Sequence, residues 1–434
     1  MKKFVRRLTS FVIAASAAMS AVPRTAQAAA ATHRKKRLLV TFKEGTTRAE
    51  REQAAKTMGL KLADDIDSLQ VSVLEAAGDV AEQDVARARR QSNVVTVEED
   101  VYRKWLLDSP GSFQGAPMPS VEETLQALGR PKRGPATTTS DDPGTAPDQP
   151  DDSASEDANV PWGVARVDAP SAWPKGRGEG VKIAVIDTGI DCAHPDLRCD
   201  FSAGMNILDP GSDPRDDNEH GTHVSGTIAG RGTGAEGVFG VAPRATLMPV
   251  KVLDADGAGS LSDIVKGISW ATKAGADVIN MSLGGPNGSA ALERAVAKAI
   301  KAGVVVVCAA GNSGPDPDTV GFPGGYPGVI AVGASDRQDG VAPFSSRGDA
   351  VAFIAPGVNI RSTVPGGGYK KLSGTSMASP HVAGLAALAI ERGASGPDGV
   401  RAAFASAASE LCGARTCLAP AAEGSGMIDA AKLR

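Results

Sequence analysis

The chain has 434 residues, more than one hydrophobic core usually serves, so more than one folding unit is expected. Its 46 Lys and Arg residues nearly balance its 50 Asp and Glu residues, and the formal net charge is -4 at pH 7. A chain with this balance presents no broad basic field, which argues against a role in binding nucleic acid or an anionic membrane surface.

The first residues carry the features of an export signal. Residues 1–28 begin with four Lys and Arg side chains, continue with the apolar run Phe11–Met19 and end in the small-residue sequence Ala26-Gln27-Ala28. The pattern is typical of a secretory signal peptide, and the run is shorter than the roughly 20 residues of a membrane-spanning helix. No later segment is long and apolar enough to span a membrane. We therefore expect a secreted, extracellular protein.

A small α+β domain is predicted next, over residues 36–107. Strand-like runs such as Leu38–Phe42 and Val94–Val97 enclose helix-like sequence near 48–58 and 80–89. The alternation of both kinds of pattern within such a short segment indicates one compact folding unit.

Residues 108–157 are rich in Pro, Gly, Ser, Thr and Asp, and we expect a disordered acidic linker there. From residue 158 to 434, short apolar runs alternate with amphipathic helical stretches, which predicts an α/β domain with a parallel sheet covered by helices on both faces. The expected strands are Val181–Ile186, Thr246–Leu253, Val278–Leu283, Val304–Cys308 and Val329–Val332, and the clearest helices are Leu261–Lys273 and Ala290–Lys301.

Five cysteines in an exported chain allow at most two disulfides within one molecule. The pairs that lie close in sequence are Cys192 with Cys199 and Cys412 with Cys417. Cys308 ends an apolar run, so we expect it to be a buried free thiol, without a role as a nucleophile.

Polar residues follow two of the predicted strands. Asp187 comes directly after Val181–Ile186, and Asn312 follows Val304–Cys308 after three small residues. Because ligands of open α/β sheets bind outside the carboxyl ends of the strands, both residues are candidates for a functional site.

The chain has five histidines, so candidates for a general base are few. His33 lies in the removable front of the chain, His194 lies in a loop bounded by cysteines, and His381 follows Pro380 within a helix. His220 and His223 remain, in one predicted helix. His220 at the start of this helix is the candidate base, and His223 is expected to pack inside.

Ser376 stands at the start of the apolar helix that contains Val382–Leu388. Partly positive amide groups at a helix N-terminus stabilise a developing anion. A helix cap is the ordinary role for a serine at this position, and taken alone it would be favoured.

Three segments together resemble the signature blocks of the subtilases, the subtilisin-like serine proteases. They are Val185–Gly189, His220–His223 and Gly374–Ala378, and they occur in the subtilisin order Asp, His, Ser. The resemblance covers residues 160 to about 429. It implies a subtilisin-like fold and a serine endopeptidase in which Asp187, His220 and Ser376 are catalytic, with no cofactor required for the chemistry.

Further blocks extend the resemblance. Ala309–Gly314 is similar to the family's oxyanion-hole segment, which assigns Asn312 as the oxyanion donor. Two segments are expected to bind an extended substrate as an added strand. The residues assigned to substrate binding are Gly257, Ala258, Gly259, Ser282, Leu283, Gly284, Ala309, Ala310, Gly311 and Gly321. An open pocket floor at Gly321 and walls without acidic residues imply a preference for large apolar or aromatic residues before the cut, within broad specificity.

The front domain resembles the subtilase propeptide, which inhibits its own enzyme, and Val97–Asp100 is the most similar patch. A self-processed zymogen is implied, cut at Trp105-Leu106-Leu107, with Arg130–Arg133 as another site. Asp196 matches a calcium ligand of the family, whereas Ala158 and Gly234 stand where side-chain oxygens are expected. A structural calcium is therefore an expectation that rests on Asp196 alone.

Other interpretations remain open at this stage. His220 and His223 could hold zinc, although His-x-x-His is not the helical His-Glu-x-x-His pattern. The sequence Gly232-x-Gly234-x-x-Gly237 formally matches a dinucleotide fingerprint but follows a helix instead of a strand. A catalytically dead binding protein on the same fold has no support, because all the candidate residues are present. The acidic run Asp213, Asp216 and Asp217 is either a second calcium site or a solvated loop. The expected partners are protein and peptide substrates and the chain's own propeptide, and the sequence predicts a monomer.

Overall fold

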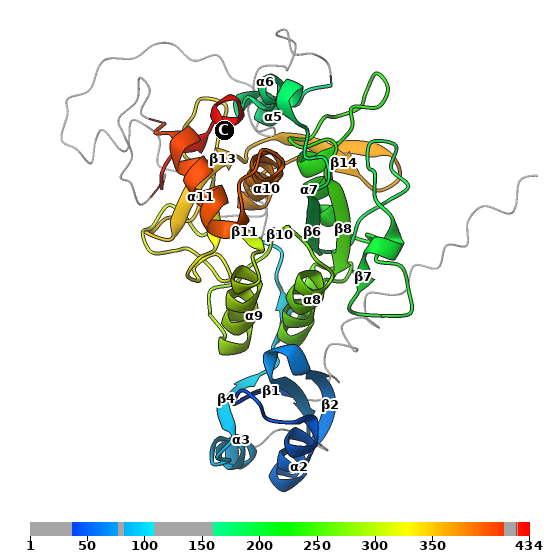
Figure 1. The fold of residues 1–434 in the computed structure, drawn as a ribbon, viewed down its shortest axis with the longest axis vertical. Helices are drawn as coiled ribbons and strands as arrows, with labels where there is room; N and C mark the ends of the chain where they lie inside the picture. Colours follow the sequence, from blue (N-terminus) through cyan, green and yellow to red (C-terminus); the bar gives the residue numbers. More distant parts are fainter. Residues whose placement is uncertain (1–36, 77–81, 108–158, 412–421, 423) are drawn as a thin grey trace, which may run out of the picture.

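The computed structural model describes residues 37–76, 82–107, 159–411, 422 and 424–434 (Figure 1). The expected signal peptide, the acidic linker with its Arg130–Arg133 site, and the Cys412–Cys417 pair lie outside these residues. A small N-terminal domain lies at one end of the molecule, next to helices α8 and α9 of a larger main domain (Figure 1). No helix among the described residues is long and apolar enough to cross a membrane.

The N-terminal domain is the expected α+β unit. Its antiparallel sheet has the order β2-β3-β1-β4. The strands are β1 (Arg37–Phe42), β2 (Lys61–Ile66), β3 (Val71–Glu75) and β4 (Val94–Glu99), with helices α2 (Arg48–Met58), α3 (Glu82–Arg89) and the 3₁₀ turn η1 (Asp67–Leu69). Helix α2 begins at a capping box of Thr47 and Glu50 and ends at Gly59, whose positive φ of 77° suits a glycine.

The main domain is built on a nine-stranded sheet of order β16-β17-β13-β12-β11-β10-β6-β8-β7, in which only the β16–β17 pair is antiparallel. The fold predicted from the sequence is thereby confirmed. The strands are β6 (Lys182–Asp187), β7 (Met205–Asn206), β8 (Thr246–Lys251), β10 (Val278–Met281), β11 (Val305–Ala309), β12 (Ile330–Ser335), β13 (Val351–Pro356), β16 (Ala408–Ser409) and β17 (Met427–Ile428).

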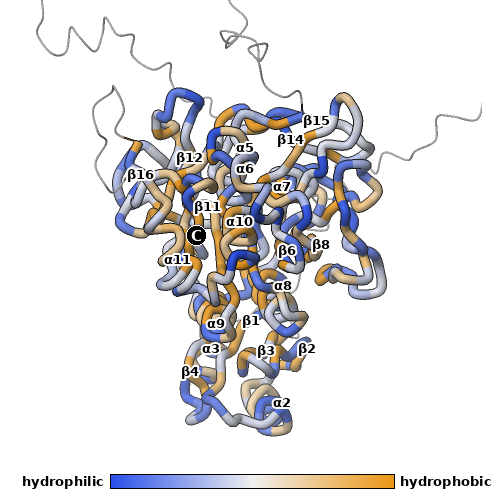
Figure 2. Tube along the Cα trace, turned by 45° about the horizontal axis from the view of Figure 1, so that its top comes forward, coloured by the Kyte–Doolittle hydropathy of each residue, from blue (hydrophilic) through white to orange (hydrophobic). Residues whose placement is uncertain are grey.

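Helices cover both faces of this sheet, since successive strand residues point to opposite sides. Ile183 and Val185 of β6 face a core shared with α7 (His220–Ala229), α10 (Thr375–Glu391) and α11 (Gly396–Ala407). Ala184 and Ile186 face the core of α8 (Leu261–Lys273) and α9 (Ala290–Lys301). The apolar strands and α10 fill the interior of the main domain (Figure 2).

Shorter elements complete the domain. They are the helices α5 (Trp162–Arg166) and α6 (Ala169–Ala172), the 3₁₀ turns η3 (Trp173–Lys175), η4 (Phe201–Ala203) and η5 (Ala430–Lys432), and the hairpin of β14 (Ile360–Val364) and β15 (Gly368–Leu372).

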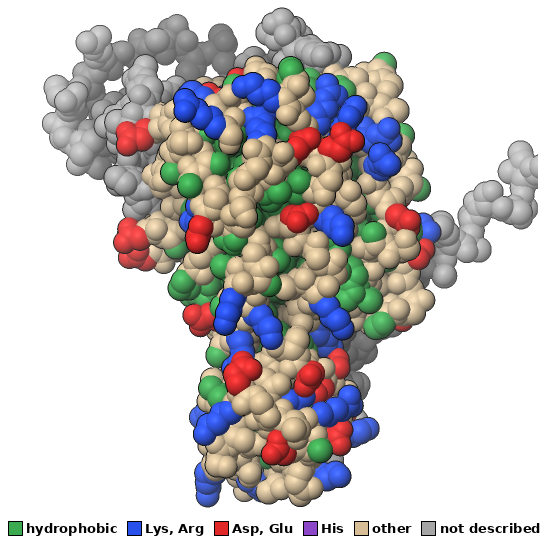
Figure 3. Space-filling view, in the orientation of Figure 1, with side chains coloured by type: hydrophobic (Ala, Val, Ile, Leu, Met, Phe, Trp, Pro, Cys, Tyr) green, Lys and Arg blue, Asp and Glu red, His purple; other side chains and the backbone are tan. Residues whose placement is uncertain are grey.

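The N-terminal domain packs on α8 and α9 with an apolar face. Leu39, Val71 and Val73 of its sheet belong to the same core cluster as the inner residues of these two helices. Charged pairs surround this contact, among them Lys266 with Asp64 at 2.7 Å (Figure 3 shows Lys and Arg side chains where the two domains meet). The two domains therefore share one continuous hydrophobic core.

Two carboxylates of the N-terminal domain also cap helices of the main domain. The Glu98 carboxylate accepts hydrogen bonds from the backbone N–H groups of Ala290 and Ala291, at 2.9 and 3.0 Å, at the start of α9. The Asp100 carboxylate accepts from the N–H and the hydroxyl of Ser262 in α8, both at 2.8 Å. These free N–H groups carry the positive end of each helix dipole, so the two acids stabilise the docked arrangement.

Candidate active site

Asp187 and His220 meet at the carboxyl end of the central strands. The strands that follow β6 in the chain lie on opposite sides of it, β8 on one side and β10 on the other, which is where open α/β sheets bind ligands. Asp187 is the last residue of β6. Oδ1 of Asp187 lies 2.8 Å from Nδ1 of His220, the first residue of α7, and Oδ2 lies 3.0 Å from it. Asp187 is completely buried, and its Oδ1 also accepts from the backbone N–H of Thr188 at 2.7 Å. A buried carboxylate in this position fixes the imidazole orientation and favours the Nδ1–H tautomer.

The pKa of His220 reflects two opposed influences. Burial disfavours the charged imidazolium and lowers the pKa, whereas Asp187, followed by Asp216 and Glu219, raises it. The net result is a pKa above the ordinary 6.5. His220 is thus a stronger base than an isolated imidazole and can hold a proton that it receives.

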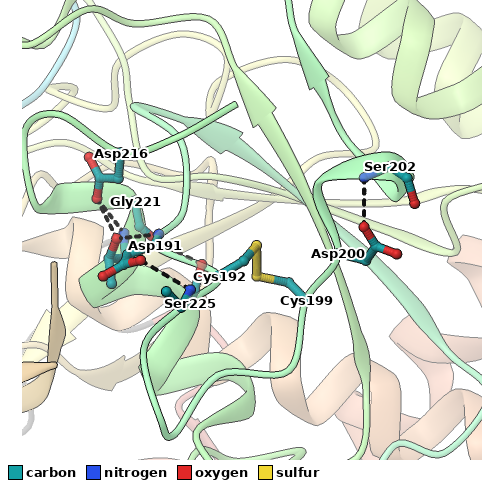
Figure 4. The surroundings of a disulfide bond; sticks show 10 residues. Asp191, Cys192, Cys199, Asp200, Ser202, Asp216, Gly221 and Ser225 are labelled. Carbon is teal, nitrogen blue, oxygen red and sulfur yellow. Dashed lines mark hydrogen bonds between the residues drawn. A yellow bond between two sulfur atoms is a disulfide. The ribbon is translucent and has the colours of Figure 1, made fainter. Parts of the chain in front are cut away.

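The turn before His220 is organised by Asp216, which the sequence left open as a calcium ligand or a solvated residue. Its Oδ1 accepts from the Thr188 hydroxyl at 2.8 Å and from the N–H groups of Asn218 and Glu219. Its Oδ2 accepts from the N–H and the hydroxyl of Thr222 at 2.9 and 2.6 Å. Figure 4 shows this carboxylate beside the first turn of α7. Asp216 therefore joins the residue after Asp187 to the helix that carries His220.

The close approach of these two segments also depends on Gly221. A Cβ atom at Gly221 would lie 2.1 Å from the carbonyl oxygen of Gly189, a distance that no real Cβ contact shows. The N–H of Gly221 donates to the Thr188 hydroxyl at 3.0 Å. The glycine that follows His220 in the sequence block thus has a steric explanation.

Behind Asp187 lies a buried lysine. The Lys251 ammonium donates to the carbonyl oxygens of Thr188 and Leu253, at 2.6 and 2.8 Å, and pairs with Asp217 at 2.6 Å. Lys251 is 5% exposed. Asp217, whose side chain is 53% exposed, is consequently used in an ion pair with this lysine, and the carboxylate of Asp216 is used within the turn.

Ser376 occupies the first turn of α10, beside its N-terminal residue Thr375. Pro380 has no N–H to donate to the Ser376 carbonyl four residues earlier, and the Ser282 hydroxyl donates to that carbonyl instead, at 2.8 Å. The Ser376 hydroxyl donates to the Ser282 carbonyl at 3.1 Å. Among the described residues, Nε2 of His220 is buried and has no hydrogen-bond partner. A hydroxyl near this nitrogen would complete its hydrogen bonding.

The Asn312 side chain and the backbone nitrogen of Ser376 both lie close to Gly374. Oδ1 of Asn312 accepts from the N–H and the hydroxyl of Thr375, at 3.0 and 2.9 Å, which orients the carboxamide. A Cβ atom at Gly374 would lie 3.3 Å from Asn312 Nδ2 and 3.6 Å from the Ser376 nitrogen. The Asn312 carboxamide nitrogen and the Ser376 backbone nitrogen therefore lie on the same side of Gly374, and two N–H donors near one point are what an oxyanion site requires.

The tail of the N-terminal domain runs between the two segments assigned to substrate. Strand β5 (Tyr102–Lys104) pairs antiparallel with β9 (Ala258–Ser260). Trp105 continues it, donating from its N–H to the Gly257 carbonyl at 3.0 Å and accepting from the Gly284 N–H at 3.0 Å. Both segments therefore bind an extended chain, here the tail of the N-terminal domain, through backbone hydrogen bonds.

The remaining residues assigned to substrate binding lie along one connected wall. Gly321 donates from its N–H to the Ala310 carbonyl at 2.9 Å, and Gly285 and Phe322 exchange backbone hydrogen bonds at 2.8 and 2.9 Å. Leu107 lies against this wall, because a Cβ atom at Gly284 would be 3.7 Å from its Cδ2. Ala309 and Gly311 flank Ala310 at the end of β11, and Leu283 is buried between Ser282 and Gly284.

His223, His381 and Cys308 have structural surroundings. Nε2 of His223 contacts the carbonyl oxygens of Ile360 and Lys370, and burial lowers its pKa to about 3. Burial likewise lowers the pKa of His381 to about 4 and raises the pKa of the Cys308 thiol. The described part of the chain contains no group of three or more His, Cys, Asp or Glu residues arranged to hold a metal ion. The zinc interpretation of His220 and His223 thus has no structural support.

The expected disulfide between Cys192 and Cys199 is present, with the two Cα atoms 5.2 Å apart (Figure 4). It closes the loop that contains His194 and Asp196, and Cys308 is the buried free cysteine predicted from the sequence.

Asp196 does not have the surroundings of a calcium ligand. Its Oδ1 accepts from the Thr233 N–H, and its Oδ2 accepts from the Val238 N–H at 2.7 Å and from the Tyr369 hydroxyl at 3.0 Å. Calcium requires six to eight oxygen ligands that are free to face it. Both carboxylate oxygens of Asp196 face hydrogen-bond donors, so the donor set does not fit the ion.

The comparisons with known proteins show the family of the chain. The family model described as "Subtilase family" matches residues 178–422, and the model described as "Fervidolysin N-terminal prodomain" matches residues 20–100. The chain is 49% identical over 256 residues to Subtilisin E of Bacillus subtilis (strain 168), an alignment covering 58% of this chain and 66% of the relative. It is also 49% identical over 238 residues to Subtilisin of Bacillus pumilus, covering 54% and 86%. It is 49% identical over 235 residues to M-protease of Shouchella clausii (strain KSM-K16), covering 54% and 60%.

These alignments span a little under two thirds of Subtilisin E and most of the Bacillus pumilus relative. The resemblance stated from the sequence blocks is confirmed, for the main domain and for the N-terminal domain alike. The chain belongs to the subtilase family of peptidases and carries a fervidolysin-type prodomain.

Proposed function

We propose that the chain is a secreted serine endopeptidase, made as a self-processed zymogen, which hydrolyses peptide bonds through an acyl-enzyme. The observation that carries this proposal is the 2.8 Å contact between Asp187 and His220 at the strand ends where Ser376 also lies. No cofactor is needed for this chemistry. The expected partners are protein and peptide substrates and the prodomain, and the active form is a monomer.

The proposed reaction uses the side chains described above. The Ser376 hydroxyl is proposed to leave the Ser282 carbonyl and to donate to Nε2 of His220, which is buried and has no hydrogen-bond partner among the described residues. His220 removes the proton as Ser376 attacks the scissile carbonyl, and Asp187 stabilises the imidazolium that forms. His220 then protonates the leaving amine, and water releases the acyl group by the reverse sequence.

The negative charge on the tetrahedral intermediate is proposed to fall beside Gly374, within reach of the Asn312 side chain. Nδ2 of Asn312 and the N–H of Ser376 donate to the oxyanion there. Loss of one such donor from a subtilisin costs about 10²- to 10³-fold in turnover, and a loss of similar size is expected for Asn312→Ala.

Substrate is proposed to bind as an extended strand between Gly257–Gly259 and Ser282–Gly284. The antiparallel pairing of β5 with β9 supports this, because backbone pairing places little demand on sequence. The wall formed by Ala309, Ala310, Gly311 and Gly321 carries no acidic side chain, so a large apolar or aromatic residue is preferred before the cut. Faster cleavage of Arg substrates than of Phe or Leu substrates would contradict this specificity.

Self-processing is proposed to follow Leu107. Trp105 and Leu106 already bond to Gly257 in the groove, and Leu107 lies against Gly284. A substrate is proposed to run through the groove in the same direction as this segment. Once cut, the same segment remains in the groove as an inhibitor.

The test compares the full chain with its Ser376→Ala and Ser373→Ala variants. Ser373 is the matched control, since it lies three residues away and its hydroxyl accepts from the Asn359 N–H instead. Each protein is treated with a serine-directed sulfonyl fluoride, the adduct is located by mass spectrometry, and casein cleavage and prodomain release are followed. The expected adduct is on Ser376, with cleavage and processing lost only in Ser376→Ala. Equal casein digestion by both variants, with Ser376 unlabelled, would refute the proposed mechanism.

A further inference from the structure

The loop Arg231–Phe239, which we call the glycine-rich loop, is held in an unusual way. It follows α7, and its ends meet in a backbone bridge between Arg231 and Phe239. Three of its carbonyl oxygens, those of Gly232, Gly234 and Glu236, accept hydrogen bonds from side chains outside the loop. Several carbonyl oxygens in one loop would suit a cation, but here side-chain N–H groups donate to them.

Asn159 provides the first of these groups. Its Nδ2 donates to the carbonyl oxygens of Gly232 and Gly234, at 3.1 and 2.8 Å, and its own carbonyl accepts from the Phe239 N–H at 2.7 Å. Direct hydrogen bonds of this length leave no room for an ion between the amide and the two oxygens. Asn159 thus holds both halves of the loop, the first half through its side chain and the second through its backbone carbonyl.

Arg361 on β14 provides the second. Its guanidinium donates to the Glu236 carbonyl at 2.8 Å and contacts the Glu236 carboxylate at 3.3 Å. It also lies over the ring of Tyr369, with 4.7 Å from the guanidinium carbon to the ring centroid. A guanidinium places a full positive charge against the carbonyl, as a metal cation would, but needs no bound ion to do so.

Asp196 binds the buried side of the loop. It is completely buried, its backbone carbonyl accepts from the Arg231 N–H at 3.0 Å, and its carboxylate accepts from Thr233 and Val238. The Tyr369 hydroxyl donates to the same carboxylate at 3.0 Å. Every oxygen of Asp196 is thereby used to hold the loop or the hairpin next to it.

We propose that Asn159, Arg361 and Tyr369 lock the glycine-rich loop onto the β14–β15 hairpin in place of a structural cation. The family resemblance suggested calcium at Asp196, whereas the donor groups described above bond to both carboxylate oxygens of Asp196 and to three carbonyl oxygens of the loop. The loop is then stable without calcium. Because β15 leads directly into α10, the lock also steadies the segment that ends at Ser376.

The test measures hydrogen exchange of the loop amides, a readout that does not depend on catalysis. The full chain carries Ser376→Ala to prevent digestion, and exchange at Thr233 and Val238 is compared in excess EDTA and in millimolar calcium. Equal protection in the two conditions is expected. In Arg361→Ala, protection of both amides should fall about tenfold, since a hydrogen bond to a charged group is lost.

Two further variants keep the test decisive. Arg244→Ala is the matched control, because Arg244 also forms an ion pair, with Glu179 at 3.0 Å, away from the loop. It should leave protection of the loop unchanged. Asn159→Ala tests the lock independently if Arg361→Ala does not fold. Higher protection of the unsubstituted loop in calcium than in EDTA would overturn the proposal, and so would unchanged protection in both lock variants.

Discussion

The backbone carbonyl of Trp105, in the prodomain, accepts a 3.0 Å hydrogen bond from the N–H of Gly284, in the peptidase domain. On its other side, the indole N–H of Trp105 donates to the Gly259 carbonyl at 2.9 Å. The tryptophan therefore bridges the two edges between which a substrate would bind. Its side chain is 2% exposed and belongs to the core shared by the two domains. Docking of the prodomain and occupation of the groove consequently depend on the same residue.

Replacing Trp105 with Ala should weaken retention of the cleaved prodomain. The lost ring and hydrogen bond are expected to cost about 3 kcal/mol, or roughly 100-fold in affinity. The delay between chain cleavage on a gel and the onset of casein hydrolysis should shorten accordingly. Val95→Ala is the control, since Val95 is 53% exposed, and it should leave the delay unchanged. An unchanged delay in Trp105→Ala would show that this residue does not hold the prodomain.

The Cys192–Cys199 disulfide should make a modest contribution to stability. It closes a short loop, with a sequence separation of 7, so its removal is expected to cost about 2 kcal/mol. For a domain of this size, the melting temperature of a Cys192→Ser, Cys199→Ser double variant should fall by about 5 °C. Measurements belong in the Ser376→Ala background. A reductant should lower the melting temperature of the parent by the same amount and leave the double variant unaffected. Any other response would mean that the disulfide is not the source of the change in stability.

The sequence predicted correctly those helices whose apolar pattern and N-terminal cap are encoded in the segment itself. The helices Leu261–Lys273 and Ala290–Lys301 have the predicted bounds, because Ser260 and Ser289 precede clear amphipathic repeats. The strand predicted over Val278–Leu283 ends at Met281 instead. The residues that follow leave the sheet because they bond to the prodomain tail, to Phe322 and to α10, all of which are distant in sequence.

The β14–β15 hairpin was not predicted, and its stabilising contacts explain why. The hydroxyls of Ser362 and Thr363 donate to the carbonyl oxygens of His223 and Thr222 in α7, at 2.7 and 2.8 Å. Its sequence is polar, and it depends on partners more than a hundred residues away. Strand propensity depends strongly on such packing.

The same distinction applies to the site. Asp187, His220, Ser376 and Asn312 follow apolar runs or begin helices, so sequence blocks were sufficient to select them. Asp216 lies in an acidic run that looks solvated from its neighbours alone. Only the fold brings the Thr188 hydroxyl and the first turn of α7 to its carboxylate.

The acidic limb of the pH profile should report the raised pKa of His220. The imidazole must be neutral to accept the Ser376 proton, so kcat/KM is retained above this pKa and lost as pH falls through it. The midpoint of this limb is therefore expected above pH 6.5, the ordinary pKa of a histidine side chain. Glu219→Gln removes a negative charge that raises the pKa of His220, and it leaves the partner Lys370 positive.

The limb should accordingly move to lower pH in Glu219→Gln, and it should move less at high salt than at low salt. Glu179→Gln removes an exposed carboxylate, paired with Arg244, and should not move the limb. A shift of the Glu219→Gln limb to higher pH would mean that Glu219 acts on His220 through the turn structure and not through its charge.

Asp216→Asn should lower kcat while leaving KM nearly unchanged. The carboxylate accepts five hydrogen bonds from the two segments that carry Asp187 and His220, and an amide can accept at only one of its two polar atoms. The imidazole would then be less well placed, which is expected to reduce kcat about 10- to 100-fold. The substrate contacts proposed at Gly257 and Gly284 do not involve Asp216, so KM is expected to be retained. Asp213→Asn is the matched control in the same acidic run, since its carboxylate is half exposed and its side-chain contact is with Arg215. Equal kcat values for the two variants would refute the positioning role of Asp216, whereas a loss confined to Asp216→Asn would connect the turn before α7 directly to the orientation of the base.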